Sequence, residues 1–474
     1  MATDPDYKES MLAVLRARGY RAASDGKYGT PFLGNGGTAD AQVIGDLPAL
    51  YSRSRELNRD DPIACGLTWT FVRNVIGTGM RPQSRTPDSE KNAKHEAVWA
   101  ERCDLLALAD DMTHAEHQRC VFWKVLEDGG VLVKKTTTDG DDGVWFEVIE
   151  KDRIGTPPGM IQSRMIVDGV KKDEYSRVQG YHVLKSAALG GGLGAREYEF
   201  VPKSQARHLR LATRPGQTHG VPAYHAVTKD LRDLDLLILA ALKRVQVSAC
   251  LSAFITSEKK MDDLLEVTAQ ANGYRLDQGL EPGMLFKLYP GESIETLIPN
   301  FPNSEFEPFI VLLARRIGAA LGVSWQIVLK DFSQSTYSSA RTDLLEARQA
   351  YRQYQSWFAD KLLRWEWVSV LEDARLRGDK RLSASTPEEI AAVQWIPNGW
   401  RWIDPQNEVA ATELELKLGI TTLQEVCASQ GKDWEEVMRQ RLIEQKRERE
   451  MREELGVEAE EKKGDADAGD VQAD

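Results

Sequence analysis

The segment HAEHQRC, residues 114–120, holds the residue types most suited to metal chemistry in this 474-residue sequence. His114, His117 and Cys120 are spaced three residues apart, so they would share one face of a helix, and imidazole and thiolate are common zinc ligands. One interpretation is therefore the zinc site of a metal-dependent enzyme. The other is a helix face with two polar histidines and a small buried cysteine. The second is favoured, because structural zinc sites normally take paired cysteines from C-x-x-C loops.

Other sequence signatures of catalysis are missing. The chain has no G-x-x-x-x-G-K-[ST], no G-x-S-x-G and no H-E-x-x-H motif. Its glycine runs at 34–37 and 190–194 lack the strand-to-helix context of a dinucleotide site, so they are typical of loops. We therefore expect no enzymatic activity and no cofactor.

The stretch DFSQSTYSSAR, residues 331–341, is rich in side chains that form hydrogen bonds and contains no glycine or proline. It lies between two strongly apolar helical patterns. Hydroxyls and amides can exchange hydrogen bonds with water and with a passing polar partner at low cost. The alternative is a polar loop on the outer surface, where most loops lie.

Composition excludes several classes of protein. An apolar fraction of 42% suits a globular chain, and the length predicts more than one structural unit. The formal net charge of −12 argues against a dedicated nucleic-acid binder with a broad basic face. Five scattered cysteines indicate a reducing compartment without a disulfide framework. No apolar run is long enough to span a bilayer, and the acidic N-terminus is unlike a signal peptide.

The N-terminal third is predicted to be helical after a glycine-rich arm. Residues 20–46 have little periodicity and are expected to have little structure of their own. A helix follows, because Asp61 can cap its first N–H groups, Pro62 suits its first turn, and glycines at 77 and 79 can end it. Residues 90–127 again have a helical pattern.

The middle of the chain changes to strands and then to long helices. Residues 130–212 contain several β-rich runs separated by turn signals, which predicts antiparallel hairpins and an α+β fold. Two apolar helices, at about 223–250 and 304–322, flank a short β-like module. A very long helix is predicted from Ser339, its candidate cap, to about residue 370. Further charged helices follow, and the acidic tail is expected to be disordered.

Six segments together resemble the lambda-type family of phage portal proteins, over about residues 50–455. The resemblance depends on SRELNRDDPIACGLTWTFVRNVIGTGMRP, RPGQTHGVP, PGMLFKLYPGESIE, DFSQSTYSSAR, WRWIDPQNEVAA and GKDWEEV. Each segment alone is weak evidence, but the set in this order is specific. Thr336 stands where the family often has Asn.

The resemblance implies a portal fold that assembles as a ring, usually of twelve copies, around a central channel. It predicts an N-terminal arm at 1–50, an α+β wing at 51–222, stem helices at 223–253 and 303–325, a β-containing clip at 254–302, a channel-lining tunnel loop at 326–342, a long helix returning to the wing at 343–384, a helical crown at 385–455 and an acidic tail at 456–474.

The implied function is structural. Double-stranded DNA would pass through the ring at one capsid vertex during packaging and ejection, held only transiently and without sequence specificity. The implied partners are the terminase large subunit, the major capsid and scaffold or protease proteins, and head-completion or adaptor proteins. The protein would be found in the virion and, during assembly, in the host cytoplasm, with no membrane partner. A different ring-forming connector protein is a further alternative, although such proteins are usually smaller.

The same resemblance assigns the hydroxyl-rich stretch to the narrowest part of the channel. Weak contacts suit a wall along which DNA moves, whereas a dense lysine and arginine lining would hold the duplex. A few basic side chains are expected there, although Arg341 could equally pair or cap within its own subunit. The candidate channel residues are Lys330, Ser333, Gln334, Ser335, Thr336, Tyr337, Ser338 and Arg341.

Overall fold

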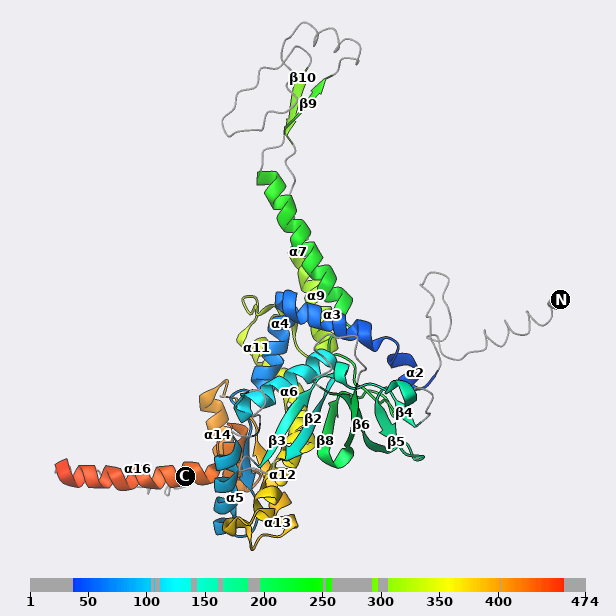
Figure 1. The fold of residues 1–474 in the computed structure, drawn as a ribbon. Coiled ribbons are helices and arrows are strands. Elements are labelled where there is room, and N and C mark those ends of the chain that lie inside the picture. Colours follow the sequence, from blue (N-terminus) through cyan, green and yellow to red (C-terminus); the bar gives the residue numbers. More distant parts are fainter. Residues whose placement is uncertain are drawn as a thin grey trace, which may run out of the picture.

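The computed structural model describes most of the chain, and its arrangement is shown in Figure 1. The described residues are 37–103, 106, 111–137, 143–160, 165–185, 197–249, 253–257, 292–296, 306–400 and 402–455. The predicted acidic tail and most of the predicted arm and clip lie outside these ranges.

The N-terminal part forms helices that begin earlier than predicted. Helix α2, Ala39–Val43, occupies residues expected to lack structure, and helix α3, Leu47–Asp60, follows it. The prediction is wrong there because tertiary contacts order this segment: the Asp40 carboxylate accepts from the backbone N–H and the hydroxyl of Thr218, each at 2.6 Å. Short-range periodicity contains no information about such a partner.

Helix α4, Pro62–Val75, forms as predicted. The Asp61 carboxylate accepts from the N–H groups of Ile63 and Ala64 at 2.7 and 2.9 Å. Gly77 and Gly79 after it have positive φ angles, as expected for a helix stop. Helices α5, Ser89–Arg102, and α6, His114–Asp128, replace the single helical pattern predicted for 90–127.

The strands form antiparallel sheets, as predicted. A three-stranded sheet has the order β3–β2–β8, and a four-stranded sheet has the order β4–β5–β6–β7. A second hydrophobic cluster, separate from the main core, joins residues of both sheets. The strand bounds are β2 Gly130–Thr137, β3 Val144–Ile149, β4 Ile166–Val167, β5 Val170–Lys172, β6 Val178–Leu184, β7 Tyr198–Pro202 and β8 Ala206–Arg210. Single 3₁₀ turns occupy Lys151–Arg153, Pro158–Met160 and Lys203–Gln205.

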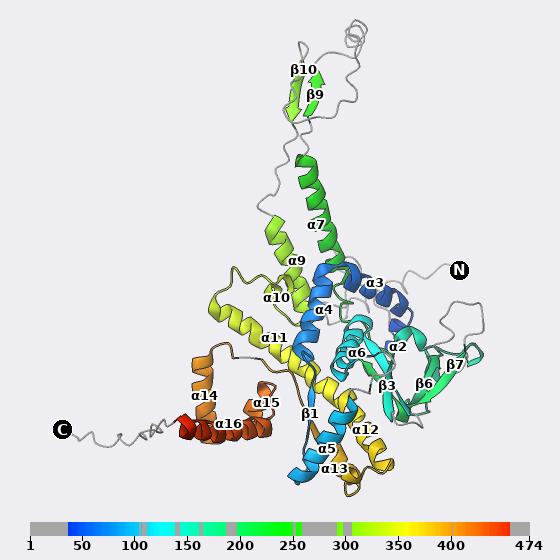
Figure 2. The ribbon, with the colours of Figure 1, turned by 60° about the vertical axis from the view of Figure 1, so that its left-hand side comes forward.

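A helical hairpin projects from this body. Helix α7, Thr228–Ala249, and helix α9, Phe306–Leu321, contact each other and point away from the sheets in both views (Figures 1 and 2). Strands β9, Ala253–Ser257, and β10, Glu292–Thr296, pair antiparallel at its far end. Two apolar helices flanking a β module were predicted, and the described residues agree.

The C-terminal part returns to the body before leaving it again. Helix α10, Trp325–Leu329, precedes helix α11, Tyr337–Phe358, which continues through a π-helical turn, Ala359–Leu363, into helix α12, Arg364–Leu376. A 3₁₀ turn, Lys380–Leu382, and helix α13, Pro387–Ala391, follow. Strand β11, Val393–Ile396, then pairs antiparallel with strand β1, Arg81–Ser84. The module beyond residue 402 consists of α14 Pro405–Leu418, α15 Leu423–Ser429 and α16 Trp434–Leu455.

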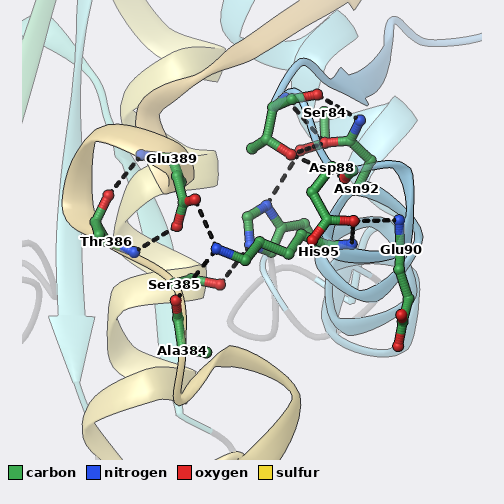
Figure 3. A network of polar contacts seen from close by, with 11 residues as sticks. Ser84, Asp88, Glu90, Asn92, His95, Ala384, Ser385, Thr386 and Glu389 are labelled. Carbon is green, nitrogen blue, oxygen red and sulfur yellow. Dashed lines mark hydrogen bonds and ion pairs between the residues drawn. The ribbon is translucent and has the colours of Figure 1, made fainter.

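A polar network fastens α5 to the segment around α13 (Figure 3). The buried His95 ring lies between two serines, with Nδ1 3.1 Å from Ser84 Oγ and Nε2 2.9 Å from Ser385 Oγ. Beside it, Lys91 Nζ donates to Glu389 at 2.6 Å. Burial lowers the pKa of His95, which favours the neutral ring that two hydroxyls can satisfy.

Candidate DNA channel segment

The turn before the candidate segment depends on a glycine in the last turn of α9. The N–H of Val323 donates to the carbonyl of Gly318 at 3.0 Å, so the chain folds back directly over the helix. A Cβ on Gly318 would lie 2.4 Å from the oxygen of Val323, which leaves room for glycine alone. Helix α10 consequently packs against α9 and α4. This packing fixes where the candidate segment begins.

Lys330, the first predicted channel residue, ends α10 in the left-handed conformation with φ 58°. Its Nζ donates to the hydroxyl of Thr70 on α4. Burial lowers the pKa of Lys330, and the nearby Arg73 lowers it further. The side chain is thus directed back onto its own subunit.

Residues 331–336 form the loop itself. The Asp331 carboxylate accepts from the N–H of Ser333 at 2.9 Å, and the N–H of Ser335 donates to the carbonyl of Phe332 at 3.0 Å. The hydroxyl and N–H of Ser333 also hold the pKa of Asp331 below its usual value. Gln334 is exposed and reaches Glu307 of α9 at 3.4 Å. The predicted residues Ser333, Gln334 and Ser335 are therefore together in one short, largely exposed turn.

The loop is shorter than predicted, because α11 begins at Tyr337 and its cap is Thr336. The hydroxyl of Thr336 accepts from the N–H of Ser339 at 3.3 Å, whereas Ser339 occupies the first turn. The prediction of Ser339 as the cap is wrong: both residues can cap a helix, and the N–H they satisfy depends on where the loop ends. Tyr337 and Ser338 are exposed residues of that first turn.

Arg341 lies one turn further along α11 and faces another segment of the chain. Its Nη2 is 3.6 Å from Glu408 Oε1, which supports the intrachain alternative for this residue. The predicted channel residues therefore divide into four in the loop, of which Thr336 is also the cap, three in the first two turns of α11, and Lys330 against α4. Phe332, 39% exposed, and Asp331 were not predicted. The spacing of Asp331 and Ser333 is a recognisable Asx-turn signal that could have identified Asp331.

The histidines of the zinc alternative meet a carboxylate instead of the cysteine. His114 Nε2 and His117 Nε2 lie 3.0 and 2.9 Å from the two oxygens of Glu366, which is buried on α12. Cys120 lines a different hollow, with Trp69 and Trp123. Within the described ranges, no group of three or more His, Cys, Asp and Glu residues is arranged to hold a metal ion.

The Glu366 cluster is instead a buried junction between α6 and α12. Burial alone would raise the pKa of Glu366, but the two imidazoles outweigh it and lower the pKa to about 2. The side-chain N–H of Gln118 donates to His114 Nδ1 at 3.1 Å and fixes that ring. The histidines were recognisable from their spacing, whereas Glu366 lies about 250 residues away and no local pattern points to it.

Known proteins similar to this chain are phage portal proteins. The family model described as "Phage portal protein, lambda family" matches residues 33–355. The portal protein B of Escherichia phage lambda is 24% identical, covering 92% of this chain and 91% of its own. The probable portal protein of Halomonas phage phiHAP-1 is 23% identical (93% and 88%), and the portal protein of Escherichia phage N15 is 24% identical (86% and 86%).

A solved structure with a similar chain is the neck of a native gene transfer agent particle computed with C12 symmetry. It shares 12% identity with a TM-score of 0.45, covering 82% of this chain and 93% of its own.

The family model, which matches more than half of the chain, defines the class of protein. The chain belongs to the lambda family of phage portal proteins, a structural family with a portal or connector role. In the described part of the chain, no helix is both long and apolar enough to cross a bilayer.

Replacing Thr336 with Ala tests the start of α11. We expect a local loss of about 1 kcal/mol because one N–H loses its cap. Hydrogen exchange at residues 337–341 should therefore accelerate. Ser338→Ala, in the same exposed first turn, is the matched control and should leave exchange almost unchanged. A larger effect of Ser339→Ala than of Thr336→Ala would restore Ser339 as the cap.

Replacing Glu366 with Gln tests the buried junction. Two imidazole donors would lose their charged acceptor, so we expect a loss of about 2 kcal/mol at pH 7 by denaturant unfolding. The folded pKa of about 2 lies below the ordinary 4.5. The stabilisation is therefore complete above pH 4.5 and is lost as the pH falls towards 2, so the difference between wild type and variant should narrow over that window.

Glu388→Gln, which changes an exposed carboxylate on α13, is the control. It should leave the free energy of unfolding almost unchanged at each pH. A difference that stays constant down to pH 3 would show that Glu366 does not act through its charge.

Proposed function

We propose that this portal protein forms a closed ring, twelvefold as in the family it resembles, at one vertex of a capsid, with double-stranded DNA passing through the centre. The observation that supports it most is the exposed apolar surface of the projecting hairpin. On α7, Leu236, Leu239 and Leu242 are 48%, 44% and 52% exposed. On α9, Phe309 and Leu312 are each 50% exposed.

Each apolar stripe lies on a different side of its helix from the residues that are buried in the core. The buried residues are represented by Leu234 on α7 and Ile317 on α9. A closed ring needs one surface that fits a different surface of the next copy. The α7 stripe of one subunit against the α9 stripe of its neighbour meets that requirement.

The proposed regions follow the described elements. The sheets and α3–α6 form the wing, α7 and α9 the stem, and β9 and β10 the described part of the clip. The loop at 331–336 lines the channel, and α14–α16 form the crown. In this arrangement the clip is the docking surface for the terminase large subunit and later for head-completion proteins. Capsid and scaffold proteins surround the wing.

The channel assignment of the loop is supported by its chemistry. Ser333, Gln334 and Ser335 offer hydroxyl and amide groups in a turn held at both ends by α10 and by the α11 cap. Such groups bind phosphates weakly and exchange with water, which permits DNA to move. The two basic residues nearest the loop, Lys330 and Arg341, are engaged with their own subunit.

Assembly is tested by placing charge on the α7 stripe. Leu239→Glu combined with Leu242→Glu should leave the subunit folded and weaken association at least about 100-fold, because two leucines lose their burial between copies. Negative-stain electron microscopy and native mass spectrometry should show rings with a central hole for the wild type and monomers for the variant. Leu376→Glu, at a leucine 80% exposed at the end of α12, should still form rings.

A monodisperse wild-type monomer at micromolar concentration in several salts would contradict the ring. If the double variant forms rings as well as the wild type, the proposed ring would still hold, but the α7 stripe would be excluded as its interface.

DNA handling is tested by removing the polar side chains of the loop without disturbing the helix cap. The triple variant Ser333→Ala, Gln334→Ala, Ser335→Ala should assemble normally. In packaging assays, retention of full-length DNA should fall about tenfold or more, since each subunit loses several weak hydrogen bonds.

Ser204→Ala with Gln205→Ala, an exposed Ser–Gln pair in the wing, is the control and should package normally. If the triple loop variant fails to form rings but any residual particles retain DNA normally, the loop lies at a subunit interface and not in the channel.

A further inference from the structure

The segment that leads to the C-terminal helices runs along α11, the helix that begins at the candidate channel loop. We call residues 397–408 the strap; the structure describes all of them except residue 401. The strap starts where β11 ends and finishes in the first turn of α14, which Asp404 caps. Its contacts with α11 are not used by the proposed ring interface or by the channel loop itself.

Six residues of α11 contact the strap, from the first turn of the helix to its last. They are Tyr337, Arg341, Arg348, Tyr351, Arg352 and Gln355. At 3.6 residues per turn these positions fall within about 100° of arc, so they form one continuous face of the helix. The strap therefore occupies that face over the full length of α11.

The contacts at the channel end are polar and exposed. The hydroxyl of Tyr337 lies 3.5 Å from the carbonyl of Ile403. Arg341 Nη2 lies 3.6 Å from Glu408 Oε1, in the first turn of α14. Each is weak alone, but both join the first two turns of α11 to the base of the C-terminal module.

The middle of the face is formed around one indole. The guanidinium groups of Arg348 and Arg352 lie 5.6 and 5.7 Å from the centre of the Trp400 ring, and the Tyr351 ring lies 6.3 Å from it. The Trp400 Nε1–H donates to Asn74 on α4 at 2.9 Å. Trp400 is thus in contact with α11 and bonded to α4 at the same time.

At the far end of the face, Gln355 joins α11 to both the strap and the end of α4. The buried amide of Gln355 lies within hydrogen-bond distance of three carbonyls, of Asn398 at 3.0 Å, Asn74 at 3.1 Å and Val75 at 3.3 Å. The strap fits this joint closely, since a Cβ on Gly77 would lie 2.4 Å from the Asn398 side chain. Gly399 is equally confined, against the backbone of Gln430 after α15.

We infer that Trp400 and Gln355 are positioning residues for the channel loop, and that the strap couples the C-terminal helices to that loop through α11. The inference rests on the proposed channel role of residues 331–336. Helices α14 and α16 bury no residue within the chain, so the strap and the α15–α16 turn are their main connections to the body. A partner or DNA that moves the C-terminal helices would therefore alter the contacts between the strap and α11. Displacement of the channel loop would alter the same contacts from the other end and so move the C-terminal helices.

The test is hydrogen exchange on the full-length protein. Trp400→Ala should accelerate exchange about tenfold at residues 337–347, the channel end of α11, as well as at 402–418. Trp69→Ala is the matched control, because Trp69 also combines an aromatic partner, Trp123, with an arginine over its ring, but does not contact the strap. It should leave both regions unchanged.

The reverse direction uses two exposed or half-exposed residues whose loss leaves the core intact. Tyr337→Phe with Arg341→Gln should accelerate exchange in the second half of α14, at residues 412–418, beyond the Glu408 that Arg341 itself contacts. This variant keeps the inference testable if Trp400→Ala does not fold.

Acceleration by Trp400→Ala that is confined to 402–433, or equal acceleration by Trp69→Ala, would overturn the coupling. Unchanged α14 exchange in the Tyr337 and Arg341 variant would overturn it as well. Electron microscopy of the same samples separates the two proposals: rings without coupled exchange reject the strap and leave the portal ring intact, whereas the absence of rings rejects the ring.

Discussion

The contact between α4 and α11 is the constraint on which the rest of the structure depends. Phe71 packs edge-on against the rings of Tyr351 and Tyr354, at 5.3 and 5.9 Å between ring centres. These residues are about 280 positions apart in the chain, so everything between them forms one large closed loop. Both sheets and the projecting hairpin belong to that loop. Closing it has an entropic cost that grows only slowly with length, and the shared hydrophobic core offsets that cost.

That contact also determines where the candidate channel segment lies. Helix α10 is held between α9 and α4, and α11 leaves at the side of α4. The position of residues 331–336 is therefore fixed by the two helices that flank them, although these residues make few contacts of their own. A loop with freedom in its middle and fixed ends is compatible with weak, repeated contacts to a moving polymer.

Local features of the fold were accessible from the sequence. Asp61 and Pro62 marked the start of α4 because a cap acts on the next three residues, and β-rich runs separated by turn signals identified the strands. Features that depend on distant partners were not accessible. Strands β1 and β11 pair across about 310 residues, and neither short segment has a distinctive pattern. Glu366 was one of many acidic residues until α12 placed it between two imidazoles.

The two helices of the projecting hairpin leave and re-enter the body side by side. The far end of the hairpin can therefore gain or lose residues without shifting the register of any strand or helix in the body. Insertions and substitutions at the tip are therefore compatible with a body whose core stays unchanged.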